Sequence, residues 1–287
     1  MKLVTDFKDY EILAMKNGEK IERWGDYTLV RPDPQIIWND SNYTNWQDYD
    51  ARYNRSNTGG GKWEIKRSMP SSWIINYEDL KFNLKLMGFK HTGLFPEQAY
   101  NWNLIRETIK KSNRQVKVLN LFAYTGGASI AALKEGAEVV HVDSSRGMID
   151  WAKENVKANN LEDQKIRFLV DDVRKFVKRE IRRGNKYDII IMDPPSFGRG
   201  SKNEVWSLES DLAELIKDTS ELLSNEPLLF IINSYTTGLS KTVLENLLHL
   251  YVSSKCEGLI SSDELGLPLK DSKLILPCGI YARWEKK

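Results

Sequence analysis

The chain has 287 residues, of which 41% are hydrophobic and 29% are charged. This length predicts about two domains, and the composition is typical of a globular protein. The formal net charge is only +2, so a nucleic-acid site would have to come from a local basic patch. Two cysteines, Cys256 and Cys278, exclude a disulfide framework and indicate a reducing compartment.

The sequence lacks an apolar segment for a membrane and a cluster of residues spaced to bind a metal. Its N-terminus has no apolar segment of the secretory type, and no apolar run reaches the ~18 residues that a membrane helix needs. His91, His141 and His249 are scattered and do not show the spacing of metal ligands. We therefore expect a cytoplasmic protein without a membrane segment and without a metal.

Short β-like runs separated by turn residues fill the first part of the chain. Examples are 27–30 (YTLV) and 73–77 (WIINY), and six of the nine tryptophans precede residue 115. We expect residues 1–85 to form a small β-rich domain that is a candidate for binding the substrate or RNA. A helix within residues 90–111 would lead into a second domain, 86–287.

From residue 116 onward, short apolar runs alternate with amphipathic helical patterns. We expect strands at 116–122, 138–143, 166–170, 188–193 and 227–233. We expect helices at 128–135, 145–158, 172–183, 208–224 and 239–253. Such alternation predicts an α/β domain with a parallel, doubly wound sheet, to which the tail after residue 255 would add edge strands.

The first strand of this domain runs into a glycine turn and then into a helix. Gly126 and Gly127 would let a ligand approach bare backbone at a helix N-terminus. Such a turn can also serve only the packing of strand against helix, and the full G-x-G-x-x-G pattern is absent. Taken alone, this turn therefore has two interpretations: it binds a nucleoside cofactor, or it serves only the packing of strand against helix.

Acidic residues at the tips of the next two strands favour the cofactor interpretation. Asp143 ends the second strand and can accept both hydroxyl protons of a ribose. The third strand ends in Asp171 and Asp172, of which we assign Asp172 to an adenine amino group and Asp171 to a helix N-cap. A nicotinamide cofactor is the main rival, because it shares the acid that binds ribose.

The fourth strand ends in a rigid loop that carries a carboxylate and a ring. Asp193 can accept a hydrogen bond from an amino group or a ring N–H, while Pro194 and Pro195 fix the loop. Phe197 offers a face on which a base can stack. The alternative is that the prolines merely end a strand and that Phe197 belongs to the core. After the glycine turn and Asp143, we interpret Asp193, Pro194, Pro195 and Phe197 as the catalytic loop.

The stretch from Lys90 to about Tyr235 resembles class I methyltransferases that use S-adenosylmethionine (SAM). Within that class it is similar to the bacterial group that methylates large-subunit (23S) ribosomal RNA. The residues that carry the resemblance are His91–Gln98, Asn120–Ser129, Val142–Ser145, Trp151–Ala152 with Asn155, Val170–Val173 and Asp193–Phe197. The resemblance implies a Rossmann-like, mostly parallel seven-stranded sheet and SAM as the cofactor.

The resemblance also implies roles for individual residues. Cofactor-binding residues would be Ala123, Tyr124, Gly126 and Gly127 near the methionine moiety, Asp143 at the ribose and Asp172 at the adenine. The loop from Asp193 to Phe197 would hold the methyl acceptor. Ala99 stands where the group usually has arginine, so Gln98 or Asn101 would bind the methionine carboxylate instead.

The acceptor atom can be narrowed by the positions of the cysteines. Methylation of cytosine C5 generally requires a thiolate that first adds to the ring. Neither the 193–198 loop nor the 233–238 loop contains cysteine, which favours a purine nitrogen over C5. Tyr235, in the second of these loops, would bind or stack on the flipped base.

Basic residues with aromatic neighbours suggest where an RNA would bind. Arg55 and Lys62 flank the glycines at 59–61, and Arg199 and Lys202 follow the catalytic loop. The first pair would equally suit a solvated hairpin. The run 178–183 (KREIRR) ends a predicted helix, so we interpret its cations as structural.

We conclude from the sequence that the chain is a SAM-dependent methyltransferase acting on ribosomal RNA. Two alternatives stay open. One is a methyltransferase for a small molecule or a protein, and the other is a SAM- or nucleotide-binding module without catalysis.

Overall fold

The computed structural model describes residues 1–39, 44–56, 60–199 and 205–287, although not the side chain of Arg199. The chain forms two compact units. We call them the α/β unit (Met1, Tyr100–Leu265 and Gly279–Lys287) and the β unit (Lys2–Ala99 and Gly266–Cys278). The sequence had placed a single boundary after residue 85. The β unit extends further because Gly266–Cys278 pairs with its N-terminal strands, for example through the bridge between Ile12 and Leu269.

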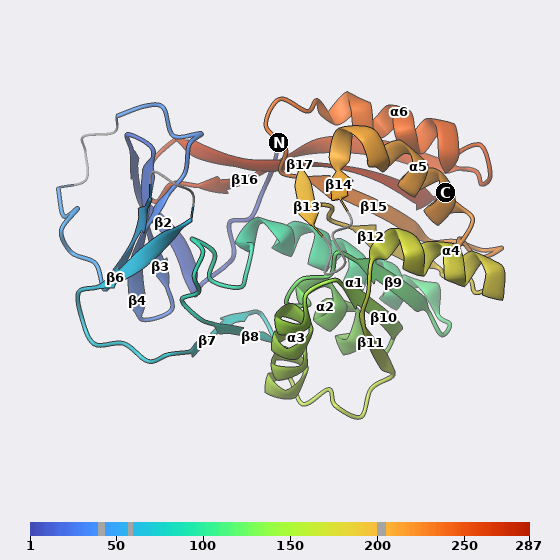
Figure 1. The fold of residues 1–287 in the computed structure, drawn as a ribbon, viewed down its shortest axis with the longest axis horizontal. Coiled ribbons are helices and arrows are strands. Elements are labelled where there is room, and N and C mark those ends of the chain that lie inside the picture. The colour runs from blue at the N-terminus through green and yellow to red at the C-terminus, as the bar shows by residue number, and fades with distance from the viewer. Residues whose placement is uncertain (40–43, 57–59, 200–204) are drawn as a thin grey trace. The chain divides into compact units, whose positions relative to one another are not determined.

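The main sheet has eight strands in the order β1-β16-β17-β15-β12-β9-β10-β11 (Figure 1). Their bounds are β1 Lys2–Leu3, β9 Lys117–Leu121, β10 Glu138–Asp143, β11 Ile166–Val170, β12 Ile189–Met192, β15 Leu229–Ser234, β16 Gly258–Pro268 and β17 Ile275–Lys286. The four contacts that join β15, β12, β9, β10 and β11 are parallel, and β17 runs antiparallel to β15. The expected doubly wound, mostly parallel sheet is confirmed, and β1 adds a short eighth strand to the predicted seven.

Helices cover both faces of this sheet. They are α1 Ala99–Ser112, α2 Gly127–Lys134, α3 Arg146–Ala158, α4 Val173–Arg183, α5 Leu208–Ser220 and α6 Lys241–Tyr251. Within the α/β unit, α2 and α3 pack against β9, β10 and β11, while α4, α5 and α6 pack side by side on the other face (Figure 1). The central strands β12 and β15 are buried throughout, which explains their continuous apolar sequence.

The β unit is built from short strands that pair antiparallel, except that β4 and β5 are parallel. One sheet has the order β2-β3-β4-β5-β6 and β7 pairs with β8. Their bounds are β2 Tyr10–Lys16, β3 Glu19–Trp24, β4 Tyr27–Pro32, β5 Ala51–Arg55, β6 Gly61–Ile65, β7 Trp73–Tyr77 and β8 Leu80–Leu84. A small core of Ala14, Ile21, Val30 and Tyr49 lies against the first sheet. This confirms that the N-terminal region is rich in β-structure.

Candidate active site

Parallel pairing brings three strand ends to one edge of the main sheet. Leu121, the last residue of β9, is in register with Val142 on one side and with Met192 on the other. Asp143 therefore ends β10 and Asp193 follows β12, the two strands that flank β9. The glycine loop leaves β9 between them. The sheet thus gathers, at one edge, the loop and the two carboxylates that the sequence had singled out.

The backbone of the glycine loop adopts a conformation that side chains rarely accept. Phe122, Tyr124 and Gly126 have positive φ angles of 54°, 51° and 90°. Strain of this kind persists only where the surroundings hold it, and it is concentrated at functional sites. Here the amide of Asn155 donates to the carbonyl oxygen of Thr125 at 2.9 Å. The loop is therefore held in place from α3.

Both glycines of the turn are required by packing, and Gly126 is also required by its positive φ. A Cβ on Gly126 would lie 3.3 Å from the Cβ of Ala152, and one on Gly127 would lie 2.9 Å from Cζ2 of Trp102. Packing against α1 and α3 therefore explains part of the motif. This tight packing leaves bare backbone at the start of α2, the arrangement that a SAM methionine moiety would need. The roles of Ala123, Tyr124, Gly126 and Gly127 toward the cofactor remain predictions.

Asp143 is a half-buried carboxylate without a cationic partner among the described residues. Its two oxygens accept the backbone N–H groups of Tyr124 at 2.9 Å and of Ser145 at 2.8 Å. Burial raises the pKa of Asp143, although these two N–H groups act in the opposite direction. Further hydrogen-bond donors, such as two ribose hydroxyls, would stabilise its charged form. The residue thus fits the predicted ribose site.

The structure corrects the assignment of the two acids after β11. Asp172, not Asp171, is the N-cap of α4, and its Oδ1 accepts the backbone N–H of Lys175 at 2.9 Å. Asp171 instead forms an ion pair with Arg179. Capping uses the residue directly before the first helical turn, and the helix begins one residue later than the sequence pattern suggested. No described residue bonds Oδ2 of Asp172, so its contact with adenine remains a prediction.

A buried polar chain lies beneath the loop. Asn120 donates to the hydroxyl of Ser129 at 3.0 Å, and that hydroxyl lies 2.9 Å from Nδ1 of His141. Burial lowers the pKa of His141 to about 3, so the ring is neutral at physiological pH. The chain links β9, α2 and β10, and it therefore fixes the strand ends from which the loop and Asp143 extend.

The proposed catalytic loop is held by hydrogen bonds that leave its ring exposed. The indole of Trp206 donates to the carbonyl oxygen of Pro195 at 2.6 Å, and the Ser196 hydroxyl lies 2.7 Å from that of Thr236. Phe197 is 58% exposed, so the alternative that made it a core residue is wrong. It lies in β13 (Phe197–Arg199), which pairs with β14 (Val205–Ser207). A rigid loop thus presents an aromatic face to solvent.

Other predicted site residues have more varied surroundings. Tyr235 follows β15, and its ring lies so close to Gly279 that a Cβ there would be 3.0 Å from it. The backbone of Arg199 lies in β13, and Lys202 lies outside the described residues. Gln98 is 9% exposed in the 3-10 turn Pro96–Gln98 of the β unit. The roles given to these four residues remain predictions.

Two of the basic residues of the β5–β6 hairpin remain available for a ligand. Arg52 donates to both carboxylate oxygens of Glu19 at 2.7 Å, and Trp63 is half-buried. Arg55 and Lys62 are exposed, and no described carboxylate pairs with either. Arg52 and Trp63 thus fit the solvated hairpin, whereas the phosphate-binding role of Arg55 and Lys62 remains a prediction.

Sequence reasoning missed several residues that hold the site in place. Trp206 anchors the catalytic loop and Trp102 packs on Gly127. Asn101, which the sequence had named only as a candidate for the methionine carboxylate, donates to Oδ1 of Asn233 at 2.9 Å within the interior. These contacts join positions that are far apart in the chain. The only signal in the sequence was that tryptophan and asparagine interrupt otherwise apolar or helical patterns.

The fold is that of a class I α/β transferase, and its candidate site for a nucleoside cofactor lies at the carboxyl edge of the sheet. The family model for S-adenosylmethionine-dependent methyltransferases matches residues 52–249. The chain belongs to that family, and SAM is its cofactor. This result excludes the nicotinamide alternative for the glycine turn.

Individual relatives support this family assignment. The solved SAM-dependent methyltransferase of Agrobacterium tumefaciens is 35% identical, with a TM-score of 0.94 over 99% of this chain and 93% of that one. Ribosomal RNA large subunit methyltransferase K/L of Shewanella frigidimarina is 39% identical over 52% of this chain and 21% of its own length. Ribosomal RNA large subunit methyltransferase I of Enterobacter sp. is 36% identical over 45% of this chain and 32% of its own. The chain thus matches only between about a fifth and a third of these two curated relatives.

The described part of the chain lacks the usual features of a membrane segment and of a metal site. No described helix has the length and apolar character needed to cross a bilayer. No group of three or more histidine, cysteine or acidic side chains within the described ranges is arranged to hold a metal ion.

Proposed function

We propose that this methyltransferase transfers the SAM methyl group to a base of RNA, and that the RNA is ribosomal. The names of the curated relatives support this substrate class. The N-terminal β unit adds a hairpin on which Arg55 and Lys62 are exposed and unpaired among the described residues. These two cations, with Arg199 and Lys202, are our candidates for phosphate contacts.

The observation that carries the proposal is the loop from Asp193 to Phe197. It places a carboxylate at the end of a central strand, a few residues before a ring that is 58% exposed. An extruded base could stack on Phe197 while Asp193 accepts a hydrogen bond from its amino or ring N–H. Methyl transfer from a sulfonium requires mainly this alignment, because the methyl group is already activated by its positive charge.

The cysteines support a purine nitrogen as the acceptor rather than cytosine C5. Burial raises the pKa of Cys256, and it raises the pKa of Cys278 far more. A thiol that attacks a pyrimidine must ionise readily, and such thiols have lowered pKa values. Cys256 follows α6 and Cys278 belongs to the β unit, so neither lies on the loops after β12 or β15.

The test is to methylate RNA from cells that lack this protein. Deproteinised RNA is incubated with the purified enzyme and methyl-labelled SAM, digested to nucleosides and analysed by mass spectrometry. We expect one labelled purine nucleoside from the ribosomal fraction, and no label with Asp193→Ala, which serves as the matched inactive enzyme. Labelled 5-methylcytidine would overturn the choice of acceptor atom while leaving the substrate class intact.

The remaining outcomes distinguish the alternatives. Label in a protein or metabolite fraction, with none in RNA, would replace the proposed substrate by another class. An enzyme that binds SAM but labels no cellular fraction would support a binding module without catalysis.

A further inference from the structure

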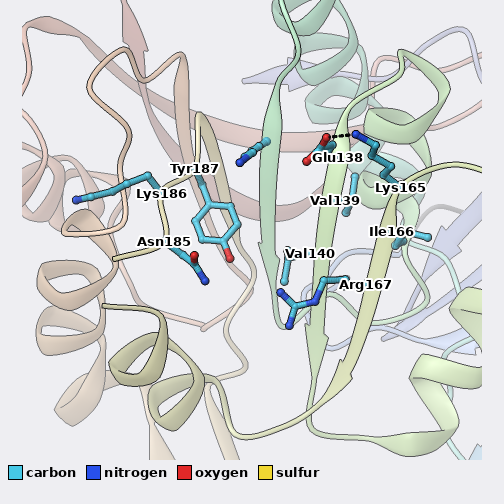
Figure 2. Close-up of a pocket in the computed structure, with 10 residues that line it drawn as sticks. Glu138, Val139, Val140, Lys165, Ile166, Arg167, Asn185, Lys186 and Tyr187 are labelled. Carbon is cyan, nitrogen blue, oxygen red and sulfur yellow. Dashed lines mark hydrogen bonds and ion pairs between the residues drawn. The ribbon is translucent and has the colours of Figure 1, made fainter. Parts of the chain in front are cut away.

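A cavity of the α/β unit lies at the amino-terminal edge of its sheet, opposite the edge that carries the candidate active site. It has a volume of about 350 Å³ and lies where β9, β10 and β11 begin. We call it the amino-edge pocket and define it by Lys117, Val140, Arg167 and Tyr187. Figure 2 shows Arg167 and Val140 on the strands, with Tyr187 and Asn185 on the connection that faces them.

The topology of the sheet explains why this pocket exists. The chain must pass from the edge strand β11 over β10 and β9 to reach β12. Helix α4 makes this crossing and ends at Arg183, where Gly184 has a φ of 69° and stops the helix. Beyond that end, no helical turn covers the first residues of the three strands. The strand starts and the connection to β12 therefore enclose the space that remains.

The strand register directs two cations to the same face at this edge. Glu138 is in register with Lys117, and Val140 is in register with Arg167. In parallel strands, residues in register project to the same face of the sheet. Lys117 and Arg167 thus flank Val140, which is only partly buried and forms an apolar floor.

The acidic groups around the pocket already have partners. Glu138 pairs with Lys165 at 2.5 Å, and Glu180 accepts the hydroxyl of Tyr187 at 2.6 Å. Asp188 accepts the guanidinium of Arg114 at 3.0 Å and the backbone N–H of Lys117 at 2.9 Å. These contacts leave no acidic side chain of the pocket free to neutralise another cation.

Lys117 and Arg167 are the cations that remain. Among the described residues neither side chain has a hydrogen bond or an ion pair, and both are exposed. The basic run of α4 behaves differently, since Lys178 pairs with Glu214 and Arg183 with Glu180. Lys186 points away from the pocket in Figure 2, and its ammonium group donates to the carbonyl oxygen of Glu221 at 2.6 Å.

We propose that the amino-edge pocket binds the phosphate backbone of the RNA substrate, with Lys117 and Arg167 as the contacts. This inference rests on the proposed function. Strand β9 has five residues, so the pocket lies roughly 15 Å from the carboxyl edge of the sheet, which carries the candidate active site. A contact at this distance cannot read the target base, but it fixes the orientation of a structured RNA on the enzyme. The two unpaired cations suit phosphate, and the partly apolar floor suits the adjoining sugar.

The test is the double variant Lys117→Ala/Arg167→Ala in the full-length enzyme. The probe is the deproteinised ribosomal RNA described above, and the readouts are KM for RNA, its dependence on salt and the Kd for SAM. We expect KM to rise by about tenfold, because two exposed charge contacts are lost. The slope of log KM against log salt should fall by about 1.5 to 2. The Kd for SAM should not change.

Two further variants serve as controls. Lys153→Ala/Lys178→Ala removes two exposed lysines that are already paired with Asp150 and Glu214, and it should leave KM for RNA unchanged. Lys117→Arg/Arg167→Lys keeps both charges and should retain most of the RNA affinity. If the alanine variant is poorly folded, this charge-retaining pair is compared with Lys117→Gln/Arg167→Gln.

The outcomes separate this inference from the proposed function. A wild-type enzyme that methylates RNA, with an unchanged KM and salt slope in the double variant, would overturn the pocket alone. Failure of the wild-type enzyme to methylate any RNA would overturn both. Adenosine monophosphate that binds the pocket in NMR titrations, with KM for RNA unaffected by the variant, would assign the pocket to a free nucleotide instead.

Discussion

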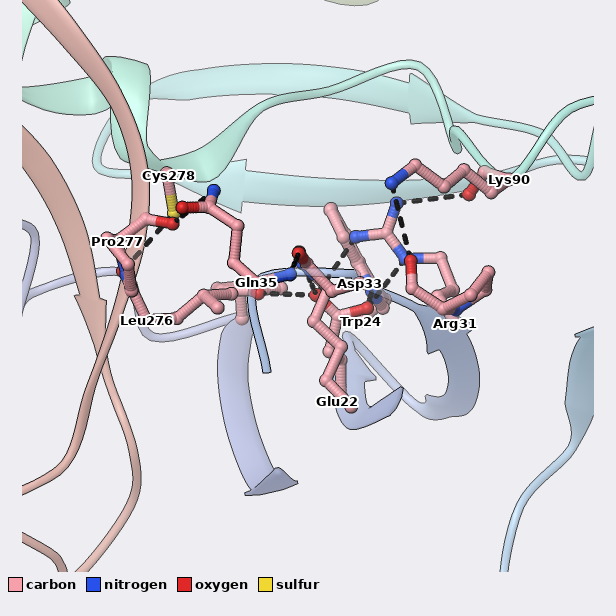
Figure 3. A network of polar contacts seen from close by, with 12 residues as sticks. Glu22, Trp24, Arg31, Asp33, Gln35, Lys90, Leu276, Pro277 and Cys278 are labelled. Carbon is pink, nitrogen blue, oxygen red and sulfur yellow. Dashed lines mark hydrogen bonds and ion pairs between the residues drawn. The ribbon is translucent and has the colours of Figure 1, made fainter. Parts of the chain in front are cut away.

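Glu22 of the β unit and Asp143 of the α/β unit are both withdrawn from solvent, yet their surroundings differ in kind. Glu22 accepts Nε of Arg31 at 2.6 Å and the hydroxyl of Tyr10 at 2.6 Å, within the network shown in Figure 3. Burial raises its pKa, but the charges of Arg31 and Lys20 outweigh burial and lower the pKa to about 2. Asp143 has two backbone N–H groups and no such cation in the described chain, and its pKa is raised by burial.

This difference distinguishes a carboxylate that stabilises the fold, Glu22, from one that is a candidate for binding a ligand, Asp143. The charge of Glu22 is compensated from within, so it stabilises the protein at neutral pH. This stabilisation is lost progressively as pH falls from the ordinary pKa of about 4.5 to the folded pKa of about 2. The charge of Asp143 is compensated, among the described residues, only by two backbone N–H groups, so hydrogen bonds from a ligand would stabilise it further. A buried acid without an internal cation is thus the stronger sign of a binding site.

The largest expected effect is a loss of stability when the charge of Glu22, which compensates that of Arg31, is removed. Glu22→Gln leaves Arg31 buried without its counter-charge and should lower the free energy of unfolding by about 3–5 kcal/mol. Urea denaturation measures this loss, and the Kd for SAM should stay unchanged. Glu11→Gln is the matched control, because its ion pairs with Arg23 and Lys270 are partly exposed and each contributes less than about 1 kcal/mol. Equal losses in the two variants would contradict the structural role of Glu22.

The converse change removes the carboxylate of the site. Asp143→Ala should weaken SAM binding about 100-fold, because two hydrogen bonds from hydroxyls to a charged acceptor are lost. Its free energy of unfolding should change by no more than about 1 kcal/mol, since burial of the charge and the two backbone bonds offset each other. Calorimetric titration measures the affinity. Asp150→Ala on α3, exposed and paired with Lys153, should bind SAM as the wild type does. Unchanged affinity in Asp143→Ala would exclude the ribose role.

A smaller effect on stability is expected from the titration of His141, the buried histidine next to the glycine loop. The pKa of His141 is lowered by burial to about 3, whereas an unfolded histidine titrates near ~6.5. The unfolded state therefore takes up the proton first, and stability is lost as pH falls from about 6.5 toward 3. Between pH 7 and pH 5 His141 should contribute a loss of about 2 kcal/mol. Urea denaturation of His141→Gln at both pH values should show a correspondingly smaller loss than the wild type.

His249 provides the comparison for this prediction. It lies in the last turn of α6, outside the buried chain of Asn120, Ser129 and His141, so His249→Gln leaves His141 in place and should retain the acid-dependent loss that His141 causes. Equal acid sensitivity of the His141→Gln variant and the wild type would show that His141 is not buried in its neutral form.

Strand and helix positions in the α/β unit followed from sequence, because buried parallel strands and amphipathic helices leave a strong local pattern. The β10 strand at Glu138–Asp143 was predicted with its observed bounds, and so was β11 at Ile166–Val170. The predicted bounds of β10 correctly placed Asp143 at the end of that strand. Local pattern was therefore sufficient to find the carboxylates of the site.

Features that depend on distant contacts did not follow from sequence. The positive φ angles of Phe122 and Tyr124 are maintained by the surrounding fold, and nothing in their own identity indicates them. The role of Asp172 as the cap depended on where α4 begins, which pattern locates only to within a residue or two. The return of Gly266–Cys278 to the β unit depends on pairing across the length of the chain.

The central claim is that the cofactor carboxylate and the acceptor loop are separate parts of one methyl-transfer site. The most direct test is Asp193→Ala, with the Kd for SAM and the single-turnover rate of methyl transfer to ribosomal RNA measured on the same enzyme. We predict a Kd within about twofold of the wild type and a rate lowered by at least about 100-fold, as for loss of one preorganised group that stabilises a transition state. A near-normal rate, or a large loss of SAM affinity, would contradict the assignment of Asp193 to the acceptor.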